Sequence, residues 1–270
     1  MLKISRCSKK FKRKYVLNDI SINFEPGVYG LLGPNGAGKT SLIRCICGLY
    51  KTDGGSIEKN GEIGYLPQKF GAFKQLSVYN MMEYFAAIKN IEKNEQASEI
   101  NRCLNAVHLD NQIDKKIKNL SGGMLRRLGI AQVMLGSPKI MIFDEPTVGL
   151  DPEERIRFKN IVNNIKKDKI ILISTHIVSD LEAVCNKILI INEGKLLFCG
   201  TNQEVSALAK NKVFLIANEN KEQIDENCIV QSSIEIEGKQ YLRILSNQKI
   251  TGDVQSPTVE DGYMCLLKQI

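Results

Sequence analysis

The stretch that decides the fold is VYGLLGPNGAGKTSLIRCICGL, residues 28 to 49. An apolar strand pattern leads into G-x-x-x-x-G-K-T, from Gly33 to Thr40, and a helical pattern follows directly. Glycines let the backbone curl until its N–H groups point at phosphate oxygens, and the helix N-terminus adds partial positive charge. The stretch therefore predicts a phosphate-binding loop between a strand and a helix.

Two side chains of this loop have predicted chemical roles. We expect Lys39 to reach the β and γ phosphates of a nucleoside triphosphate, and Thr40 to ligate Mg²⁺. A glycine-rich turn without a ligand is the alternative, but the complete pattern in this context disfavours it. The residues expected to contact the nucleotide here are Gly33, Pro34, Asn35, Gly36, Ala37, Gly38, Lys39, Thr40 and Ser41.

A pair of acids follows another apolar strand pattern, KIMIFDEP at 139–146. Asp144 suits the remaining part of the metal site, holding Mg²⁺ through water. Glu145 would face the opposite way and polarise the attacking water as general base. Two solvent-exposed acids at a strand end are common by themselves, but their combination with the phosphate loop favours a catalytic site.

Further strand patterns place the loop in an α/β domain with a largely parallel sheet. These patterns are SINFE, VYGLLG, KIMIFDE, KIILIST and KILIIN, with helices beginning near Lys39, Pro152 and Ile177. Residues 73–135 show only helical spacing, which predicts a helical subdomain inserted in the sheet domain. The fold class expected is a P-loop NTPase (RecA-like) α/β domain, residues 1–204.

Residues 205–270 have a different pattern. After a short helix at QEVSALAK, strand patterns surround a hairpin turn at Glu237 to Lys239, and a last helix follows Pro257. We expect a small β-rich C-terminal accessory unit.

Composition narrows the class of protein further. The net charge of +7 comes from lysines scattered among acids, which indicates a solvated basic surface and no nucleic-acid partner. Eight cysteines without CxxC or His/Cys ligand spacing indicate reduced, mostly buried thiols. The apolar runs are too short for a membrane span, and the N-terminus lacks a signal pattern. We expect a soluble, cytoplasmic protein.

Four more motifs carry a family resemblance: YLPQ at 65–68, LSGGM at 120–124, VGLDP at 148–152 and STH at 174–176. With the phosphate loop and the acid pair, in this order, residues 1 to about 200 resemble the nucleotide-binding subunit of an ATP-binding cassette (ABC) transporter. The resemblance implies ATP and Mg²⁺ as ligands.

In that family two cassettes stack head to tail, so each ATP lies between the phosphate loop of one and the signature helix of the other. The resemblance assigns Ser121, Gly122 and Gly123 to the γ-phosphate of a neighbour's ATP. A serine there is also a good helix N-cap, the alternative reading. Met124 departs from the family's usual glutamine, and a thioether cannot donate the hydrogen bonds of an amide. We expect an altered contact on the ribose side.

The resemblance also assigns the remaining motif residues. Gln68 would contact Mg²⁺ or water and sense the membrane partner, Asp151 would serve the D-loop as well as cap a helix, and His176 would contact the γ-phosphate. The alternatives are a solvated loop residue for Gln68 and a structural histidine for His176. An aromatic ring stacks on adenine in the family, and the spacing selects Phe11, with Tyr15 still possible.

The function implied is that of an ATPase subunit that powers transport through separate integral-membrane permease subunits, together with a second, identical or different, cassette. The subunit would lie on the inner face of the membrane, docked through KFGAFKQLSVYNMMEYF at 69–85. The ending SPTVEDGYMCLL resembles exporter cassettes for drugs and antimicrobial peptides, which favours export. The alternative is a soluble cassette ATPase acting on nucleic acid or the ribosome.

Overall fold

The computed structural model describes residues 1–225, 228–248 and 250–270, and the chain divides into two compact units, Met1–Leu196 and Leu197–Ile270. The division falls within strand β9 (Lys195–Gly200). The boundary predicted at residue 204 stays a prediction.

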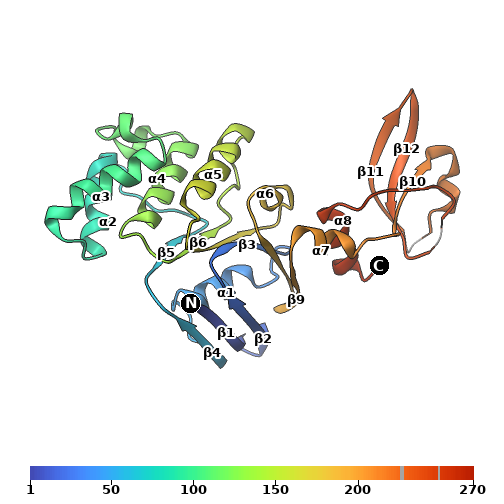
Figure 1. Ribbon diagram of the computed structural model, residues 1–270, viewed down its shortest axis with the longest axis horizontal. Helices are drawn as coiled ribbons and strands as arrows, with labels where there is room; N and C mark the ends of the chain where they lie inside the picture. Colours follow the sequence, from blue (N-terminus) through green and yellow to red (C-terminus); the bar gives the residue numbers. More distant parts are fainter. Residues whose placement is uncertain (226–227, 249) are drawn as a thin grey trace. The chain divides into compact units, whose positions relative to one another are not determined.

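The central element of the first unit is a six-stranded sheet with the order β5-β6-β7-β3-β8-β9 (Figure 1). Strands β5, β6, β7, β3 and β8 pair in parallel. Such a sheet brings the carboxyl ends of its strands to one edge, where ligands bind in open α/β folds. These strands are β3 (Gly27–Leu32), β5 (Ile63–Leu66), β6 (Ile140–Asp144), β7 (Ile170–Thr175) and β8 (Lys187–Asn192).

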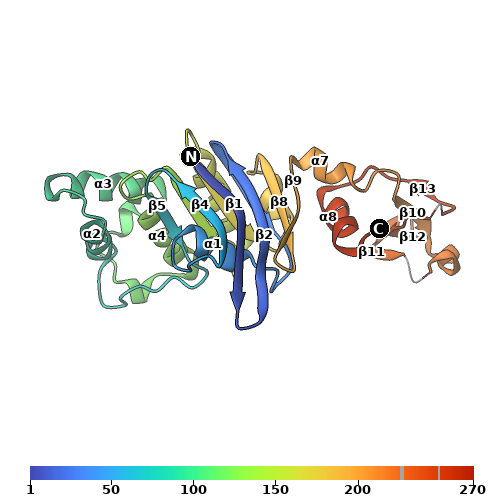
Figure 2. The same ribbon diagram turned by 90° about the horizontal axis from the view of Figure 1, so that it is seen from below.

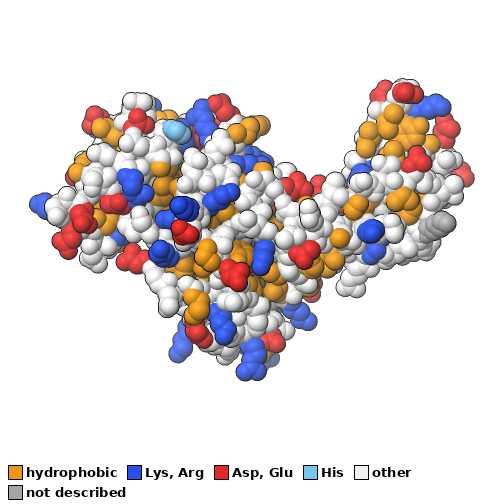
Figure 3. Space-filling model, viewed as in Figure 1, with side chains coloured by type: hydrophobic (Ala, Val, Ile, Leu, Met, Phe, Trp, Pro, Cys, Tyr) orange, Lys and Arg blue, Asp and Glu red, His pale blue; other side chains and the backbone are white. Residues whose placement is uncertain are grey.

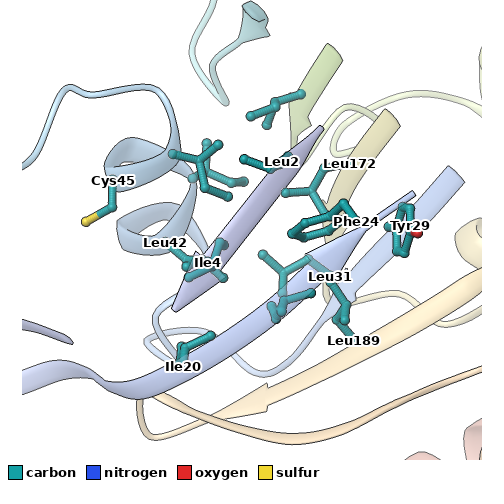
Figure 4. Packing of buried hydrophobic residues seen from close by; sticks show 14 of the residues in the cluster. Leu2, Ile4, Ile20, Phe24, Tyr29, Leu31, Leu42, Cys45, Leu172 and Leu189 are labelled. Carbon is teal, nitrogen blue, oxygen red and sulfur yellow. The ribbon is translucent and has the colours of Figure 1, made fainter. Parts of the chain in front are cut away.

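A second, antiparallel sheet has the order β2-β1-β4 and lies beside the first (Figure 2). Its strands are β1 (Leu2–Phe11), β2 (Lys14–Phe24) and β4 (Gly54–Lys59). Leu2 and Ile4 of β1 point into one apolar core together with Leu42 of helix α1 (Lys39–Ile46) and Leu172 of β7 (Figure 4). Burying each such side chain contributes about 1.5–3 kcal/mol, so the core fixes α1 and the loop that precedes it.

Helices make up most of residues 73–135, the stretch predicted to form a helical subdomain (Figure 1). Ser77 and Ser121 accept hydrogen bonds from backbone N–H groups at the starts of α2 and α4. The helical elements are α2 (Val78–Ile88), α3 (Lys93–Ala106), the 3-10 turns η1 (Asp110–Gln112) and η2 (Ile117–Asn119), α4 (Gly122–Met134), α5 (Pro152–Ile165) and α6 (Ser179–Glu182).

The second unit is the small β-rich unit that the sequence predicts. Its sheet has the order β11-β12-β10-β13, and the predicted hairpin turns at Glu237 and Gly238, both with positive φ. Val213 and Leu245 of the sheet form a small core with Cys265 of the last helix. The elements are α7 (Asn202–Ala207), β10 (Val213–Ala217), η3 (Asn218–Gln223), β11 (Ile229–Ile236), β12 (Lys239–Leu245), β13 (Asp253–Val254) and α8 (Val259–Lys268).

Two surface properties bear on the predictions. Acidic and basic side chains are interspersed on the face seen in Figure 3, as scattered lysines and acids in the sequence indicate. Every helix among the described residues falls short of the length and apolarity that a membrane span requires.

Candidate active site

A cavity of about 410 Å³ opens where the phosphate loop joins helix α1. A backbone hydrogen bond fixes the loop to the turn after β8: the Ala37 carbonyl oxygen accepts from the N–H of Gly194 at 2.9 Å. Gly38 has φ +109, and a Cβ atom there would lie 2.7 Å from the Val16 carbonyl oxygen, so the loop excludes larger residues at this point. The cavity is lined by Phe11, Val16, Asn35, Gly36, Ala37, Gly38, Lys39, Thr40, Ser41, Gln68 and Glu145.

Lys39 is buried at the floor of this cavity. Its Nζ atom donates hydrogen bonds to the carbonyl oxygens of Gly33 at 2.6 Å and Pro34 at 3.2 Å, and lies 3.5 Å from Oε1 of Glu145. Burial lowers the pKa of Lys39, although the Glu145 carboxylate acts in the opposite direction. The ammonium therefore has a carboxylate partner that an anionic phosphate could replace.

Asp144 ends strand β6 and is almost fully buried. Its Oδ1 atom accepts a hydrogen bond from the Ser174 hydroxyl at 2.5 Å and lies 3.4 Å from the Thr40 hydroxyl. Its Oδ2 atom is buried without a hydrogen-bond partner among the described residues. A buried carboxylate oxygen without a donor is unusual in folded proteins, so this atom has free capacity for a cation or water.

Glu145 stands one residue further on, where the chain leaves the sheet. Its backbone has φ 47, a left-handed conformation that is uncommon outside glycine. This turn directs the carboxylate into the cavity, where Oε2 lies 3.1 Å from Nδ1 of His176. Glu145 thus contacts both Lys39 and His176.

The two aromatic candidates for adenine differ in position. Phe11 ends strand β1, lines the cavity and packs edge-on against Tyr50 with ring centroids 5.3 Å apart. Tyr15 is similarly exposed, with Lys10 over its ring at 4.2 Å, but is not among the residues that line the cavity. The structure therefore brings Phe11, and not Tyr15, to the candidate site.

The signature residues lie apart from this cavity. Ser121 accepts a hydrogen bond from the N–H of Met124 at 3.1 Å, so its hydroxyl proton is left to donate elsewhere. A Cβ atom on Gly122 would meet open space, whereas one on Gly123 would lie 2.7 Å from the Glu154 side chain. Gly123 thus has a packing role within the chain, while Ser121 and Gly122 face outward.

Asp151 caps helix α5, accepting a hydrogen bond from the N–H of Glu154 at 2.9 Å, with Pro152 in the first turn. This is the predicted cap. Asp151 does not line the phosphate-loop cavity. Neither the signature serine nor this aspartate is therefore at the nucleotide cavity of its own chain.

Two residues at the site have contacts that the sequence reading did not assign. The Ser174 hydroxyl donates to Asp144 and accepts from the N–H of Glu145 at 3.0 Å, so one side chain aligns both acids. Arg126 of α4 donates hydrogen bonds to the carbonyl oxygens of Gln68 and Glu145 and of the residue before each of them. The sequence features that could have indicated these contacts are the serine of the STH motif and the arginine one turn into the signature helix.

The fold and this cavity define a P-loop nucleoside triphosphatase with an inserted helical subdomain. A family profile described as ABC transporter matches residues 17–148. An uncharacterized ABC transporter ATP-binding protein of Methanocaldococcus jannaschii is 34% identical over 206 residues, which cover 76% of this chain and 79% of that protein. The chain therefore belongs to the ABC transporter family as an ATP-binding ATPase subunit.

Two further similarities widen this comparison. The lipopolysaccharide export system ATP-binding protein LptB of Escherichia coli is 32% identical over 215 residues, covering 73% of this chain and 89% of LptB. A dimeric ATP-binding cassette solved in a post-hydrolysis state with ADP and Pi superposes with a TM-score of 0.68 at 21% identity, covering 74% of this chain and 98% of that one. The latter similarity concerns the fold alone.

Proposed function

We propose that this subunit hydrolyses ATP with Glu145 as general base and energises transport through separate integral-membrane permease subunits. One observation carries the proposal: the phosphate loop, Gln68 and Glu145 line a single cavity, with His176 bonded to Glu145. A structural role alone would not require a buried lysine and a buried glutamate to meet in an open cavity beside a glycine-rich loop.

The residues present fit Mg²⁺. Thr40 offers a hydroxyl, Asp144 a carboxylate whose Oδ2 is unpartnered among the described residues, and Gln68 an amide at the cavity wall. Oxygen ligands of this kind are those that Mg²⁺ prefers. Thr40, Asp144 and Gln68 would hold the ion, which would neutralise charge on the phosphates when bound.

The chain's own residues then bind and orient the phosphates. Lys39 would exchange its contacts with Gly33, Pro34 and Glu145 for phosphate oxygens, and backbone N–H groups from Asn35 to Ser41 would hold the remaining charge. An anion at the start of α1 is also favoured by the helix dipole. Phe11 would stack on adenine at the mouth of the cavity.

Glu145 would orient the attacking water and receive its proton on a carboxylate oxygen. Release from Lys39 makes Oε1 available for this, while the hydrogen bond between Oε2 and His176 keeps the carboxylate in the cavity. His176 would present its other ring nitrogen toward the γ-phosphate, a position suited to a ring with two nitrogens.

A second cassette would complete each site. Ser121 and Gly122 are exposed and separate from the phosphate cavity of the same chain, which supports their use on the ATP of another copy or of a different cassette. Asp151 would lie at this interface.

The permease would dock on aromatic side chains of the helical subdomain. Phe73 and Tyr84 are exposed and pack edge-on, with ring centroids 5.2 Å apart, and Ile88 is 58% exposed on the same helix as Tyr84. Exposed apolar side chains gathered in this way are typical of interaction sites. We place the subunit in the cytoplasm, on the inner face of the membrane, by this contact.

Export is the direction we propose. The relative LptB is named for an export system, and the C-terminal helix resembles those of exporter cassettes.

Replacing Glu145 by glutamine tests the hydrolytic site. The amide keeps the size of the side chain but cannot accept a proton from water, so steady-state turnover should fall at least ~100-fold while ATP still binds. Glu58→Gln, on exposed β4, is the matched control and should turn over normally. Near-normal hydrolysis by Glu145→Gln would contradict the assignment of the base.

A further inference from the structure

Arg126 occupies an unusual position for a charged side chain. It lies on α4, the helix that begins at the signature serine, yet its guanidinium points inward and burial lowers its pKa to about 10. Among the described residues no carboxylate lies within ion-pair distance of it. Arg126 is half-buried, and a partly desolvated charge without an ion pair needs hydrogen bonds to replace its lost hydration. The guanidinium therefore depends on the hydrogen bonds that surround it.

Five backbone carbonyl groups supply that compensation. Nη1 of Arg126 donates to the carbonyl oxygens of Pro67 at 3.1 Å and Gln68 at 3.2 Å. Nη2 donates to Asp144 at 3.0 Å and Glu145 at 2.7 Å, and Nε donates to Pro146 at 2.8 Å. One edge of the guanidinium thus contacts the loop after β5, and the other contacts the loop after β6.

These carbonyls lie where the two strands separate. The parallel pairing of β5 with β6 ends at Leu66 opposite Phe143, so Pro67 opposite Asp144 and Gln68 opposite Glu145 would be the next pairs. The hydrogen bonds from the guanidinium replace the backbone hydrogen bonds that these pairs would make. It fixes the distance between two backbones that no longer bond to each other.

The two loops that Arg126 connects carry residues with proposed roles in ATP hydrolysis. Gln68 and Glu145 both line the nucleotide cavity. Glu145 has a left-handed backbone, a conformation that persists where neighbours hold it. Its N–H is held by Ser174 and its carbonyl by Arg126, so both polar backbone atoms are fixed.

We propose that Arg126 is a positioning residue for ATP hydrolysis, a bridge that holds Gln68 and Glu145 at the separation that the reaction requires. The bridge starts from the signature helix, so displacement of that helix by a second cassette would change the hydrolytic geometry of the chain that carries it. This inference rests on the proposed function, with Glu145 as base.

The test compares Arg126→Gln, Arg126→Lys and Arg126→Ala with the native chain in ATP hydrolysis and in equilibrium ATP binding. Misplacement by about 1 Å can cost ~100-fold in rate, so kcat should fall ~10- to 100-fold in Arg126→Gln, with the dissociation constant for ATP changed less than ~3-fold. Arg126→Lys keeps the charge but has fewer donors, so it should retain an intermediate kcat.

Chemical rescue separates positioning from a general loss of structure. Guanidinium chloride, added far below unfolding concentrations, should restore part of kcat to Arg126→Ala, and ammonium chloride should not. Arg102→Gln is the matched control, because Arg102 also donates to a carbonyl of α4, that of Met134, but far from the cavity. Thermal melts identify any variant that fails to fold, in which case Arg126→Lys carries the test.

Glu145→Gln is measured in the same series, so that the two proposals can fail separately. If Glu145→Gln is inactive and Arg126→Gln has a native kcat, the role of Arg126 is overturned while the base assignment stands. A loss of ATP affinity as large as the loss of kcat, or a guanidinium effect equal on Arg126→Ala and Arg102→Gln, would also overturn it. Native turnover by Glu145→Gln would instead remove the proposed base.

Discussion

The Nζ atom of Lys39 lies 3.5 Å from Oε1 of Glu145, so the expected phosphate ligand and the expected base form an ion pair at the floor of the cavity. Both side chains are largely buried, which makes the loss of either partner costly to the other. A triphosphate would compete with Glu145 for the ammonium. With the proposed roles of Lys39 and Glu145, ATP binding would also free the carboxylate that acts as the base.

Replacement of Lys39 by alanine should reduce ATP affinity strongly. A hydrogen bond to a charged group is worth about 1.5–3 kcal/mol, so we expect the dissociation constant to rise at least ~10-fold. Isothermal titration with ATP measures the change. Lys51→Ala removes an exposed lysine of equal charge and should leave binding unchanged. Native affinity in Lys39→Ala would contradict the phosphate contact.

Replacement of Ser174 by alanine should affect both acids at once. The serine hydroxyl donates to Asp144 and accepts from the N–H of Glu145, so its loss leaves two buried groups with fewer partners. We expect the free energy of unfolding to fall by about 1–3 kcal/mol, with slower ATP hydrolysis as well. Urea unfolding and steady-state kinetics measure the two effects. Unchanged hydrolysis in a destabilised variant would limit Ser174 to a structural role.

Phe11 and Tyr15 can be separated by single substitutions. Stacking of an aromatic side chain on a base is worth about 1–3 kcal/mol, so Phe11→Ala should weaken ATP binding by ~5- to 150-fold. Tyr15→Ala removes a ring of similar exposure that does not line the cavity, and should change affinity little. The opposite ranking in a titration with ATP would reassign the adenine contact to Tyr15.

The environment of Lys89 should make the stability of the protein depend on pH. Its ammonium donates to the carbonyl oxygens of Gln132 at 2.7 Å and Leu135 at 2.9 Å, and burial lowers its pKa from 10.5 to about 8. The folded pKa lies below the unfolded value, so the unfolded chain binds more protons between these values. The contribution of this group to the free energy of unfolding therefore rises with pH across that window.

Urea unfolding of the native chain and of Lys89→Met, at about pH 7.5 and about pH 9.5, measures this contribution. The difference in free energy between the two proteins should move in favour of the native chain at the higher pH. Lys93→Met, at an exposed position on α3, is the control. A difference that stays constant with pH would show that Lys89 does not titrate in this window.

Strands with continuous apolar patterns were predictable from sequence, as VYGLL became β3 and KIMIFD became β6. Strand β1, the middle strand of the antiparallel sheet, was not predicted. Its inward side chains, such as Leu2, Ile4 and Cys7, are separated by lysines, arginine and serines, and its pairing with β2 is interrupted by register shifts. An irregular strand lacks the strict alternation on which sequence reading depends.

The active site likewise has parts that could be predicted from the sequence and parts that could not. The loop from Gly33 to Thr40 was predictable because its chemistry is local, with all its parts in one short stretch. The contacts of Arg126 were not, because the carbonyls that it binds come from the loop after β5, 58 and 59 residues away, and from the loop after β6. Only the parallel pairing of β5 with β6 brings these loops together.

In the proposed dimer two cassettes share their ATP sites, each contributing a phosphate loop to one ATP and a signature helix to the other. Light scattering of Glu145→Gln with and without ATP tests it most directly, with Ser121→Arg added in a second protein. We predict a dimer that forms only with ATP and that Ser121→Arg abolishes while each chain still binds ATP. A dimer that survives Ser121→Arg, or a monomer with ATP bound, would contradict shared sites between identical chains.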